Sequence, residues 1–256
     1  MPTVRAAGRS LAYEWIGEAH GGKPALVFLH EGLGSIRQWR DFPATLSAAT
    51  GCRALVYDRY GYGQSDVLEE KRRTVRFMHD EALVSLPELL AKLDLQNPIL
   101  VGHSDGASIA LIHAGAGHAV RGVVAMAPHV FIEPPCLRSI DRAKENFENT
   151  DLAARLGRYH RDAGKTFYGW ADVWLDPQFK GWDIREDYLP GVHCPVLAIQ
   201  GHDDEYGTMA QLDEIERRVS GPCELLKLDN CGHAPFRDQP EKVLRKTEGF
   251  IRQFLQ

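Results

Sequence analysis

The sequence predicts an α/β fold in which a mostly parallel β-sheet carries helices on both faces. Short runs rich in Val, Leu and Ile alternate along the chain with longer segments whose apolar residues recur at helical spacing. Several of the short runs are continuously apolar, which is typical of strands covered on both faces. At 256 residues, of which 44% are hydrophobic, the chain can bury the large core that such a sheet requires.

The first half of the chain follows this alternation from its start. Leu11, Tyr13 and Trp15 alternate with polar residues, which predicts an early half-buried strand. Continuous apolar runs predict strands, and apolar residues at helical spacing predict helices. The expected elements are a strand at 25–29, a helix marked by Trp39, Phe42 and Leu46, a strand at 54–57, and a long amphipathic helix at 77–93.

The second half continues the pattern after one tight turn. An apolar run at 98–101 leads into Gly102-His103-Ser104-Asp105-Gly106, and an Ala-rich run at 107–116 leads out of it. This order predicts strand, turn and helix. Later apolar runs and helical spacings predict strands at 123–126, 195–199 and 224–228, a helix at 209–219, and a terminal helix at 240–254.

One long segment interrupts the alternation. Between Pro128 and Pro190 no strand is expected, whereas helices are expected at 139–149 and 152–162. About sixty residues are too many for a plain connection, so we expect residues 1–128 and 191–256 to form a core and residues 129–190 an inserted helical cap. Its aromatic residues either form the small core of the cap or line a pocket beneath it. They are Phe167, Tyr168, Trp170, Trp174, Phe179 and Trp182.

Composition limits the classes of partner. A net charge of −5 and a pI near 6.1 leave no basic surface for nucleic acid or an anionic membrane. No apolar run reaches the length of a membrane span, and no apolar signal core follows the first residues, so the expected location is cytoplasmic. The five cysteines include no Cys-x-x-Cys pair and predict reduced thiols without a metal. Monomer and homodimer both stay open.

The turn at 102–106 predicts a reactive serine. Two glycines allow a sharp elbow between strand and helix, where a larger residue would collide with the neighbouring strand or helix. Such a turn lifts Ser104 Oγ clear of the backbone. It also places the N–H of Asp105 at a helix N-terminus, where unpaired donors and the helix dipole stabilise a developing oxyanion.

These motifs together resemble the α/β-hydrolase fold, and the resemblance covers residues 10–255. His30-Glu31-Gly32-Leu33-Gly34-Ser35 resembles the oxyanion loop of that family, and Asp58-Arg59-Tyr60-Gly61-Tyr62-Gly63-Gln64-Ser65 resembles its Asp-x-x-Gly-x-Gly-x-Ser turn. Gly201-His202-Asp203-Asp204 and Cys231-Gly232-His233 resemble its acid and histidine loops. The resemblance implies a mostly parallel sheet of the eight-stranded type. Within the family, the Ser-Asp-Gly elbow, the 189–195 segment and the compact cap look most like the biphenyl-hydrolase-like (valacyclovir hydrolase) esterases.

The resemblance implies a set of three catalytic side chains. Ser104 is the expected nucleophile, and a serine hydroxyl needs a base to remove its proton as it attacks. Among eleven histidines, His233 is favoured because it lies after the last strand on a glycine-containing loop. Asp204 occupies the fourth position of Gly-x-x-Asp and is favoured over Asp203 as the carboxylate that orients the histidine.

The resemblance also implies an oxyanion hole and a small pocket. The second donor is expected to be the backbone N–H of Gly32 or Leu33, beside that of Asp105. Glu31 stands where the family usually has glycine, so it adds a carboxylate close to the site. The expected pocket residues are Glu31, His129, Trp170 and Trp174. No metal and no cofactor are expected.

We therefore expect a serine hydrolase that cleaves small carboxylic esters through an acyl-enzyme intermediate. Alternatives of the same fold are C–C bond hydrolases, lactonases, amidases and perhydrolases, and a different class is a small-molecule receptor that retains the three side chains. Asp105, Glu31 and Glu133 are carboxylates that either surround the pocket or have ordinary roles, such as contact of Asp105 with its own helix N-terminus and exposure of Glu133 to solvent. If one of them faces the acyl group, it favours a protonated amine, and the resemblance to valacyclovir-hydrolase-like esterases implies the same α-amino-acid esters. Otherwise an unspecialised carboxylesterase is expected.

Overall fold

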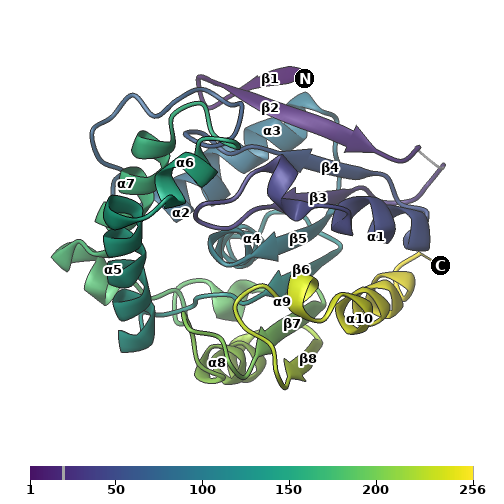
Figure 1. Ribbon diagram of the computed structural model, residues 1–256. Coiled ribbons are helices and arrows are strands. Elements are labelled where there is room, and N and C mark those ends of the chain that lie inside the picture. Colours follow the sequence, from purple (N-terminus) through teal and green to yellow (C-terminus); the bar gives the residue numbers. More distant parts are fainter. Residues whose placement is uncertain (19–20, 256) are drawn as a thin grey trace.

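The computed structural model describes residues 1–18 and 21–255, which form an eight-stranded sheet in the order β1-β2-β4-β3-β5-β6-β7-β8 (Figure 1). The strands are β1 (Thr3–Ala6), β2 (Arg9–Ile16), β3 (Leu26–Leu29), β4 (Ala54–Tyr57), β5 (Ile99–His103), β6 (Gly122–Met126), β7 (Val196–Gly201) and β8 (Cys223–Leu228). Strands β3 to β8 are parallel, and the hairpin of β1 and β2 is antiparallel. The predicted fold class is confirmed.

Strand β1 is the strand that sequence patterning did not predict. It is short and mostly exposed, so it lacks an apolar run. It pairs with β2 across a two-residue turn, with Ala6 opposite Arg9. Ala7 and Gly8 both have positive φ there, as tight hairpin turns of this kind require.

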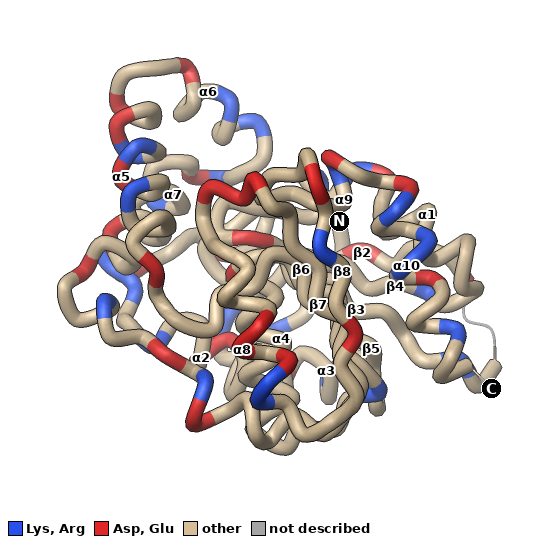
Figure 2. Tube along the Cα trace, turned by 90° about the horizontal axis from the view of Figure 1, so that it is seen from below, with Lys and Arg blue, Asp and Glu red and all other residues tan. Residues whose placement is uncertain are grey.

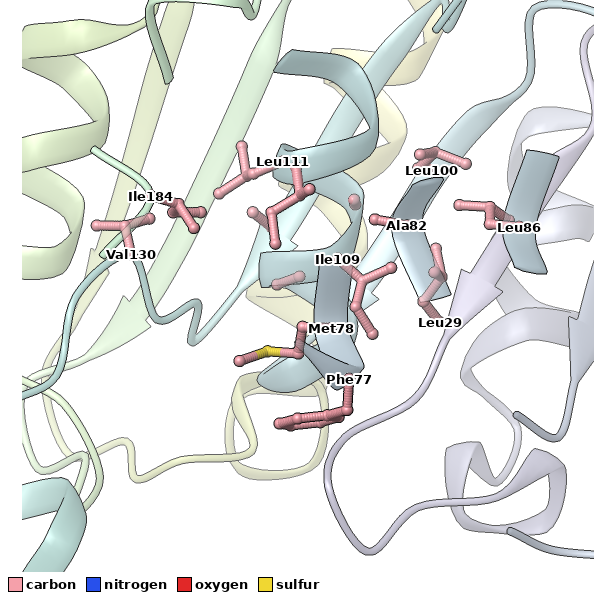
Figure 3. Packing of buried hydrophobic residues seen from close by; sticks show 14 of the residues in the cluster. Leu29, Phe77, Met78, Ala82, Leu86, Leu100, Ile109, Leu111, Val130 and Ile184 are labelled. Atoms are coloured by element: carbon pink, nitrogen blue, oxygen red, sulfur yellow. The ribbon is translucent and has the colours of Figure 1, made fainter. Parts of the chain in front are cut away.

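Helices cover both faces of the sheet, as predicted. The helices of the core are α1 (Phe42–Thr50), α2 (Phe77–Asp80), α3 (Leu86–Lys92), α4 (Asp105–Gly115), α8 (Ala210–Arg218), α9 (Pro235–Asp238) and α10 (Pro240–Arg252), and a 3-10 helix, η1 (Ile36–Trp39), precedes α1. Apolar residues of α1, α9 and α10 share one buried cluster with the sheet, and those of α2, α3, α4 and α8 share another. Figure 3 shows Leu29 and Leu100 of the sheet in this second cluster with Ile109, Ala82 and Leu86.

The helix expected at 77–93 is helical from Phe77 to Lys92 but contains a π-helical turn, η2 (Glu81–Ser85). A π-helical turn changes the hydrogen-bond ladder locally. The carbonyl of Ala82 lies within this turn and accepts a hydrogen bond from His113 Nδ1–H of α4 at 2.8 Å.

The segment between β6 and β7 is helical. It contains α5 (Pro134–Asn149), α6 (Leu152–Leu156), α7 (Ala163–Trp174), η3 (Pro177–Gly181) and η4 (Leu189–Gly191). Helix α5 begins before the expected residue 139 because two prolines fit its first turn, where no N–H donor is needed. Helix α6 ends before the expected residue 162. The first aromatic residues, Phe167 to Trp174, lie in α7, a helix that the sequence patterning did not predict. In Figure 1, α5, α6 and α7 stand together at one side of the sheet.

The parallel strands gather the motif loops at one edge. The carboxyl ends of neighbouring parallel strands meet at the same edge of a sheet, where open α/β sheets bind ligands. The loops after β3, β5, β6, β7 and β8 carry Glu31, Ser104, His129, Asp204 and His233 in that order.

Charged residues of both signs are spread over the molecule. Figure 2 shows Lys and Arg interspersed with Asp and Glu along the exposed helices and loops. Among the described residues, no helix combines the length and the apolar character that crossing a bilayer requires.

Candidate active site

Ser104 occupies a strained elbow between β5 and α4. Its φ of 52° and ψ of −120° are unusual for a residue with a Cβ, and such strain persists where packing enforces it. A Cβ at Gly102 would collide with the carbonyl of Gly106, and a Cβ at Gly106 would collide with the carbonyl of Leu29. Both glycines are therefore required for steric reasons, as the sequence indicated.

His233 and Asp204 form a hydrogen-bonded chain with Ser104. Ser104 Oγ lies 2.9 Å from His233 Nε2, and His233 Nδ1 lies 2.8 Å from Asp204 Oδ1. If Nδ1–H donates to the carboxylate, Nε2 is left free to accept from the serine hydroxyl. The three side chains come from loops 129 and 29 residues apart in sequence, and the fold brings them into contact.

Asp204 is fixed by its own loop. Its carboxylate accepts a hydrogen bond from the backbone N–H of Tyr206 at 2.8 Å and one from Gln200 Nε2 at 3.2 Å. A Cβ at Gly201 would collide with the carbonyl of Cys231, so the glycine lets the loop after β7 pass closely by the loop of His233. Asp203 is exposed on the same turn and has no side-chain hydrogen bond within the part of the chain that is described.

The electrostatics of the pair favour opposite charges. Burial lowers the pKa of His233, but the charge and hydrogen bond of Asp204 outweigh it and hold this pKa above its ordinary value. Burial also raises the pKa of Asp204, and the His233 charge with its hydrogen bonds brings it below the ordinary value. The carboxylate therefore stabilises an imidazolium.

Three backbone amides stand free beside Ser104. Asp105 is the first residue of α4, so its N–H has no partner within the helix. Across the described residues, the N–H groups of Gly32 and Leu33 also donate to no protein group. All three residues line the same pocket as Ser104. Their donors can stabilise negative charge on an oxygen bound there.

The pocket beside Ser104 has a volume of about 160 Å³ and lies between the sheet edge and the helices of the inserted segment. Larger cavities occur elsewhere on the surface, but this one is lined by Ser104 and His233. All four residues expected in the pocket line it: Glu31, His129, Trp170 and Trp174. Phe167 and Phe179 instead pack within the aromatic cluster of the helices.

Several buried polar atoms of the pocket have no partner in the described structure. They are both carboxylate oxygens of Asp105, Nδ1 of His129 and Nε1 of Trp174. Burial raises the pKa of Asp105 to about 6, although Arg59 at 4.0 Å opposes this. Burial lowers the pKa of His129 to about 3, so this ring is neutral at pH 7. The pocket is thus more polar than its aromatic residues suggested.

The expectation for Glu133 is wrong. Its carboxylate accepts hydrogen bonds from Thr208 N–H at 2.9 Å, from Thr208 Oγ1 at 2.7 Å and from Gln211 Nε2 at 2.7 Å. These bonds tie the start of α5 to the start of α8, and the residue does not line the pocket. Glu133 is structural because its oxygens are already occupied.

Sequence reasoning missed three further pocket residues. Tyr206 packs its ring 4.6 Å from that of His233, and Cys136 and Ile140 face the pocket from α5. Cys136 and Ile140 are four positions apart, which places them on the same face of a helix. This shared face could have been predicted if α5 had been expected to begin earlier. For Tyr206 the sequence carries no signal beyond its place two residues after Asp204.

Within residues 1–18 and 21–255, no group of three His, Cys, Asp or Glu side chains is arranged to hold a metal ion. The five cysteines are all free, and Cys52, Cys136 and Cys231 are buried.

Comparison with known proteins agrees with this architecture. The chain is 24% identical over 248 residues to 3-oxoadipate enol-lactonase 1 of Acinetobacter baylyi, covering 90% of this chain and 89% of that protein. Among solved structures, the enol-lactonase from Burkholderia xenovorans has a TM-score of 0.75 at 20% identity, covering 98% of this chain and 100% of that one. A meta-cleavage product hydrolase from Pseudomonas fluorescens has a TM-score of 0.75 at 18% identity, covering 99% and 98%.

The sequence model of the alpha/beta hydrolase family matches residues 26–246, which include every strand from β3 to β8. The strand order and the fold shared with the solved structures agree with this match. The chain therefore belongs to the alpha/beta hydrolase family and is a hydrolase by family.

Proposed function

We propose that the protein is a serine hydrolase that cleaves small carboxylic esters through an acyl-enzyme intermediate. The observation that carries the proposal is the chain of hydrogen bonds from Ser104 Oγ to His233 Nε2 at 2.9 Å and from His233 Nδ1 to Asp204 at 2.8 Å. Nucleophile, base and orienting carboxylate within hydrogen-bond reach are the signature of an activated serine.

In the proposed first half-reaction, Ser104 Oγ attacks the ester carbonyl carbon while His233 Nε2 takes the hydroxyl proton. The carbonyl oxygen becomes an oxyanion and accepts hydrogen bonds from the free amides of Asp105 and of Gly32 or Leu33. When the intermediate collapses, the C–O bond to the alcohol breaks and His233 returns its proton to the leaving alkoxide. Asp204 holds the ring and balances its positive charge.

In the second half-reaction, water attacks the acyl group on Ser104 and gives a proton to His233. The tetrahedral intermediate then releases the carboxylic acid, and the proton returns to Ser104 Oγ. Residues 129–190 act as a cap in this proposal, because Trp170 and Trp174 of α7 close the pocket above Ser104. A volume of about 160 Å³ restricts the bound part of the substrate to a small group.

Lactone hydrolysis is the second candidate, because a lactone is a cyclic ester that reacts by the same steps. It is favoured by the similarity over 90% of this chain to an enol-lactonase. C–C bond hydrolysis, perhydrolysis and a receptor role are also compatible with this fold. A receptor that keeps these side chains would turn over once or very slowly.

The first prediction tests the nucleophile. A fluorophosphonate probe is expected to attach covalently to Ser104, located by mass spectrometry of the labelled peptide. Ser104→Ala abolishes labelling and the multiple-turnover hydrolysis of p-nitrophenyl acetate, because the hydroxyl of Ser104 is the one within hydrogen-bond reach of His233 Nε2 in the described structure. Ser220→Ala, at an exposed serine that does not line the pocket, is the control. Labelling that persists in Ser104→Ala contradicts the proposal, and faster turnover of lactones than of matched open esters favours the second candidate.

The second prediction concerns an ammonium group on the acyl part of the substrate, as the likeness to biphenyl-hydrolase-like esterases suggests. Both carboxylate oxygens of Asp105 are buried and make no hydrogen bond among the described residues, and the residue lines the pocket. The Arg59 guanidinium lies 4.0 Å from one of them. The kcat/KM of an alanyl ester is expected to exceed that of the matched propionyl ester by about ten- to a hundredfold, because one charge-assisted hydrogen bond stabilises binding by that factor.

The pKa of Asp105 is raised to about 6, so its carboxyl group is ionised above pH 6. The preference for the alanyl ester is therefore expected above pH 6 and is expected to weaken below it. Asp105→Asn removes the preference while the propionyl ester is still cleaved. Equal kcat/KM values for the two esters in the wild type would leave an unspecialised carboxylesterase.

A further inference from the structure

Glu31 lies in the loop after β3 and contacts both the end of β5 and helix α9. Its side chain is 17% exposed and lines the pocket in the loop after β3. Oε2 lies 3.4 Å from His103 Nδ1, and Oε1 lies 3.6 Å from an Arg237 guanidinium nitrogen. Both carboxylate oxygens therefore face cationic or proton-bearing groups of the protein rather than a ligand.

His103 also contacts the loop that carries His233. Its Nε2–H donates to the backbone carbonyl of His233 at 2.6 Å. A carbonyl oxygen only accepts, so Nε2 carries a proton. The ring of His103 therefore lies between the carboxylate of Glu31 and the backbone of His233.

Arg237 provides a second route to the same loop. It lies on α9, four residues after His233, and also donates to the carbonyl of Gln38 at 2.6 Å. Glu31 thus joins the loop that carries the free amides, the residue before Ser104, and the helix after His233. Ser104 directly follows His103, and His233 lies two residues before α9.

We infer that Glu31 is a positioning residue which, through His103 and Arg237, holds the backbone of His233 so that its imidazole stays aligned with Ser104. The inference rests on the proposed function of Ser104 and His233. The Arg237 guanidinium, 3.6 Å from Oε1, also balances the charge of this carboxylate beside the oxyanion amides.

The charge of Glu31 also acts on His233. The titratable and charged groups that face this ring are Asp204, Glu205 and Tyr206 from the loop after β7, Glu31 from the loop after β3, Asp105 at the start of α4, and the rings of His103 and His129. Asp204, Glu205 and Glu31 all raise the pKa of His233. Removing the charge of Glu31 therefore lowers this pKa and moves the acid limb of the pH–rate profile to lower pH.

The experiment compares Glu31→Gln, Glu31→Asp and Glu205→Gln in ester hydrolysis and fluorophosphonate labelling. Glu205 is the matched control because it is an exposed carboxylate near His233, and no side-chain hydrogen bond of it occurs in the described structure. In Glu31→Gln, kcat on the pH plateau and the labelling rate fall about ten- to a hundredfold, while KM changes less than about twofold. The acid limb moves to lower pH. Glu205→Gln keeps the plateau kcat within about twofold.

Glu31→Asp retains the charge and is expected to return the acid limb toward the wild-type pH with part of the rate. A plateau kcat and labelling rate of Glu31→Gln within twofold of the wild type overturn the inference. So does an equal loss in Glu205→Gln, because the effect would then be one of charge alone. If wild-type Ser104 is not labelled at all, the proposed function fails first, which separates the two outcomes.

A second variant keeps the inference testable even if Glu31→Gln does not fold. His103→Leu removes the ring that lies between Glu31 and the carbonyl of His233, so it is expected to lower the plateau kcat and the labelling rate while KM changes less than about twofold. A plateau kcat of His103→Leu within twofold of the wild type overturns the inference.

Discussion

Asp203 and Asp204 are neighbours in sequence with different surroundings. Asp203 is exposed, whereas the Asp204 side chain is 1% exposed and accepts hydrogen bonds from His233, Tyr206 and Gln200. Only one of the two can therefore orient the imidazole. This difference is invisible in the sequence, where both residues follow the same strand.

The third prediction separates them. Asp204→Asn is expected to lower kcat by about 10⁴-fold, because the amide presents the wrong partner to His233 Nδ1 and the imidazolium loses its balancing charge. Asp203→Asn is the matched control and is expected to cost less than about tenfold. Steady-state kinetics with an activated ester measure both, and thermal unfolding checks the fold. A larger loss in Asp203→Asn would reverse the assignment.

At the scale of elements, one histidine connects the inserted helices to the core. His160, between α6 and α7, accepts from Gly63 N–H at 2.9 Å through Nδ1 and donates from Nε2 to Leu33 O at 3.0 Å. Thr166 at the start of α7 also donates to the carbonyl of Gly61 at 2.7 Å. The position of α7, and of the two tryptophans that line the pocket, depends on these bonds.

The fourth prediction is that His160→Leu lowers the free energy of unfolding by about 1–3 kcal/mol, because it leaves buried backbone groups of Gly63 and Leu33 unpaired. His160→Gln is expected to cost less, since an amide supplies one acceptor and one donor. Urea unfolding at pH 7.5 measures both variants. Equal losses in the two would show that ring packing, and not the pair of hydrogen bonds, matters.

At the scale of the whole molecule, buried neutral histidines make stability depend on pH. Burial lowers the pKa of five of them, to about 4 in His113 and about 3 in His129. The five are His30, His79, His113, His129 and His160. The unfolded chain binds protons at these rings below pH 6.5 and the folded chain does not, so stability is lost as pH falls through this range. The raised pKa values of Asp105 and His233 act in the opposite direction.

The fifth prediction is a free energy of unfolding about 2–4 kcal/mol lower at pH 5 than at pH 7.5. Each fully buried neutral histidine contributes up to about 2 kcal/mol over this interval, and Asp105 and His233 offset part of the sum. Urea titrations at the two pH values measure the change, with equal ionic strength as the control. Stability that rises on acidification would mean that the two opposing groups dominate.

The sequence determined the sheet and the elbow because both depend on local patterns. Continuous apolar runs mark β3 to β7, and the glycines at 102 and 106 predict a turn whose close contacts the structure confirms. Strand β1 carries no such run, since it is exposed and forms only through pairing with β2. Helix α7 was not expected either, because Gly164, Gly169 and its aromatic residues have low helix propensity.

Tertiary structure alone decided the environment of each site residue. Glu31, Asp105 and Glu133 are equivalent in the sequence as carboxylates near motifs. The fold places Glu31 beside His103 and Arg237 and hydrogen-bonds Glu133 to Thr208 and Gln211. It leaves the oxygens of Asp105 without a hydrogen bond within the described residues, with the Arg59 guanidinium 4.0 Å away. The reason is that residues distant in the chain determine the burial, the nearby charges and the hydrogen-bond partners of each carboxylate. A sequence motif describes only residues that are adjacent in the chain.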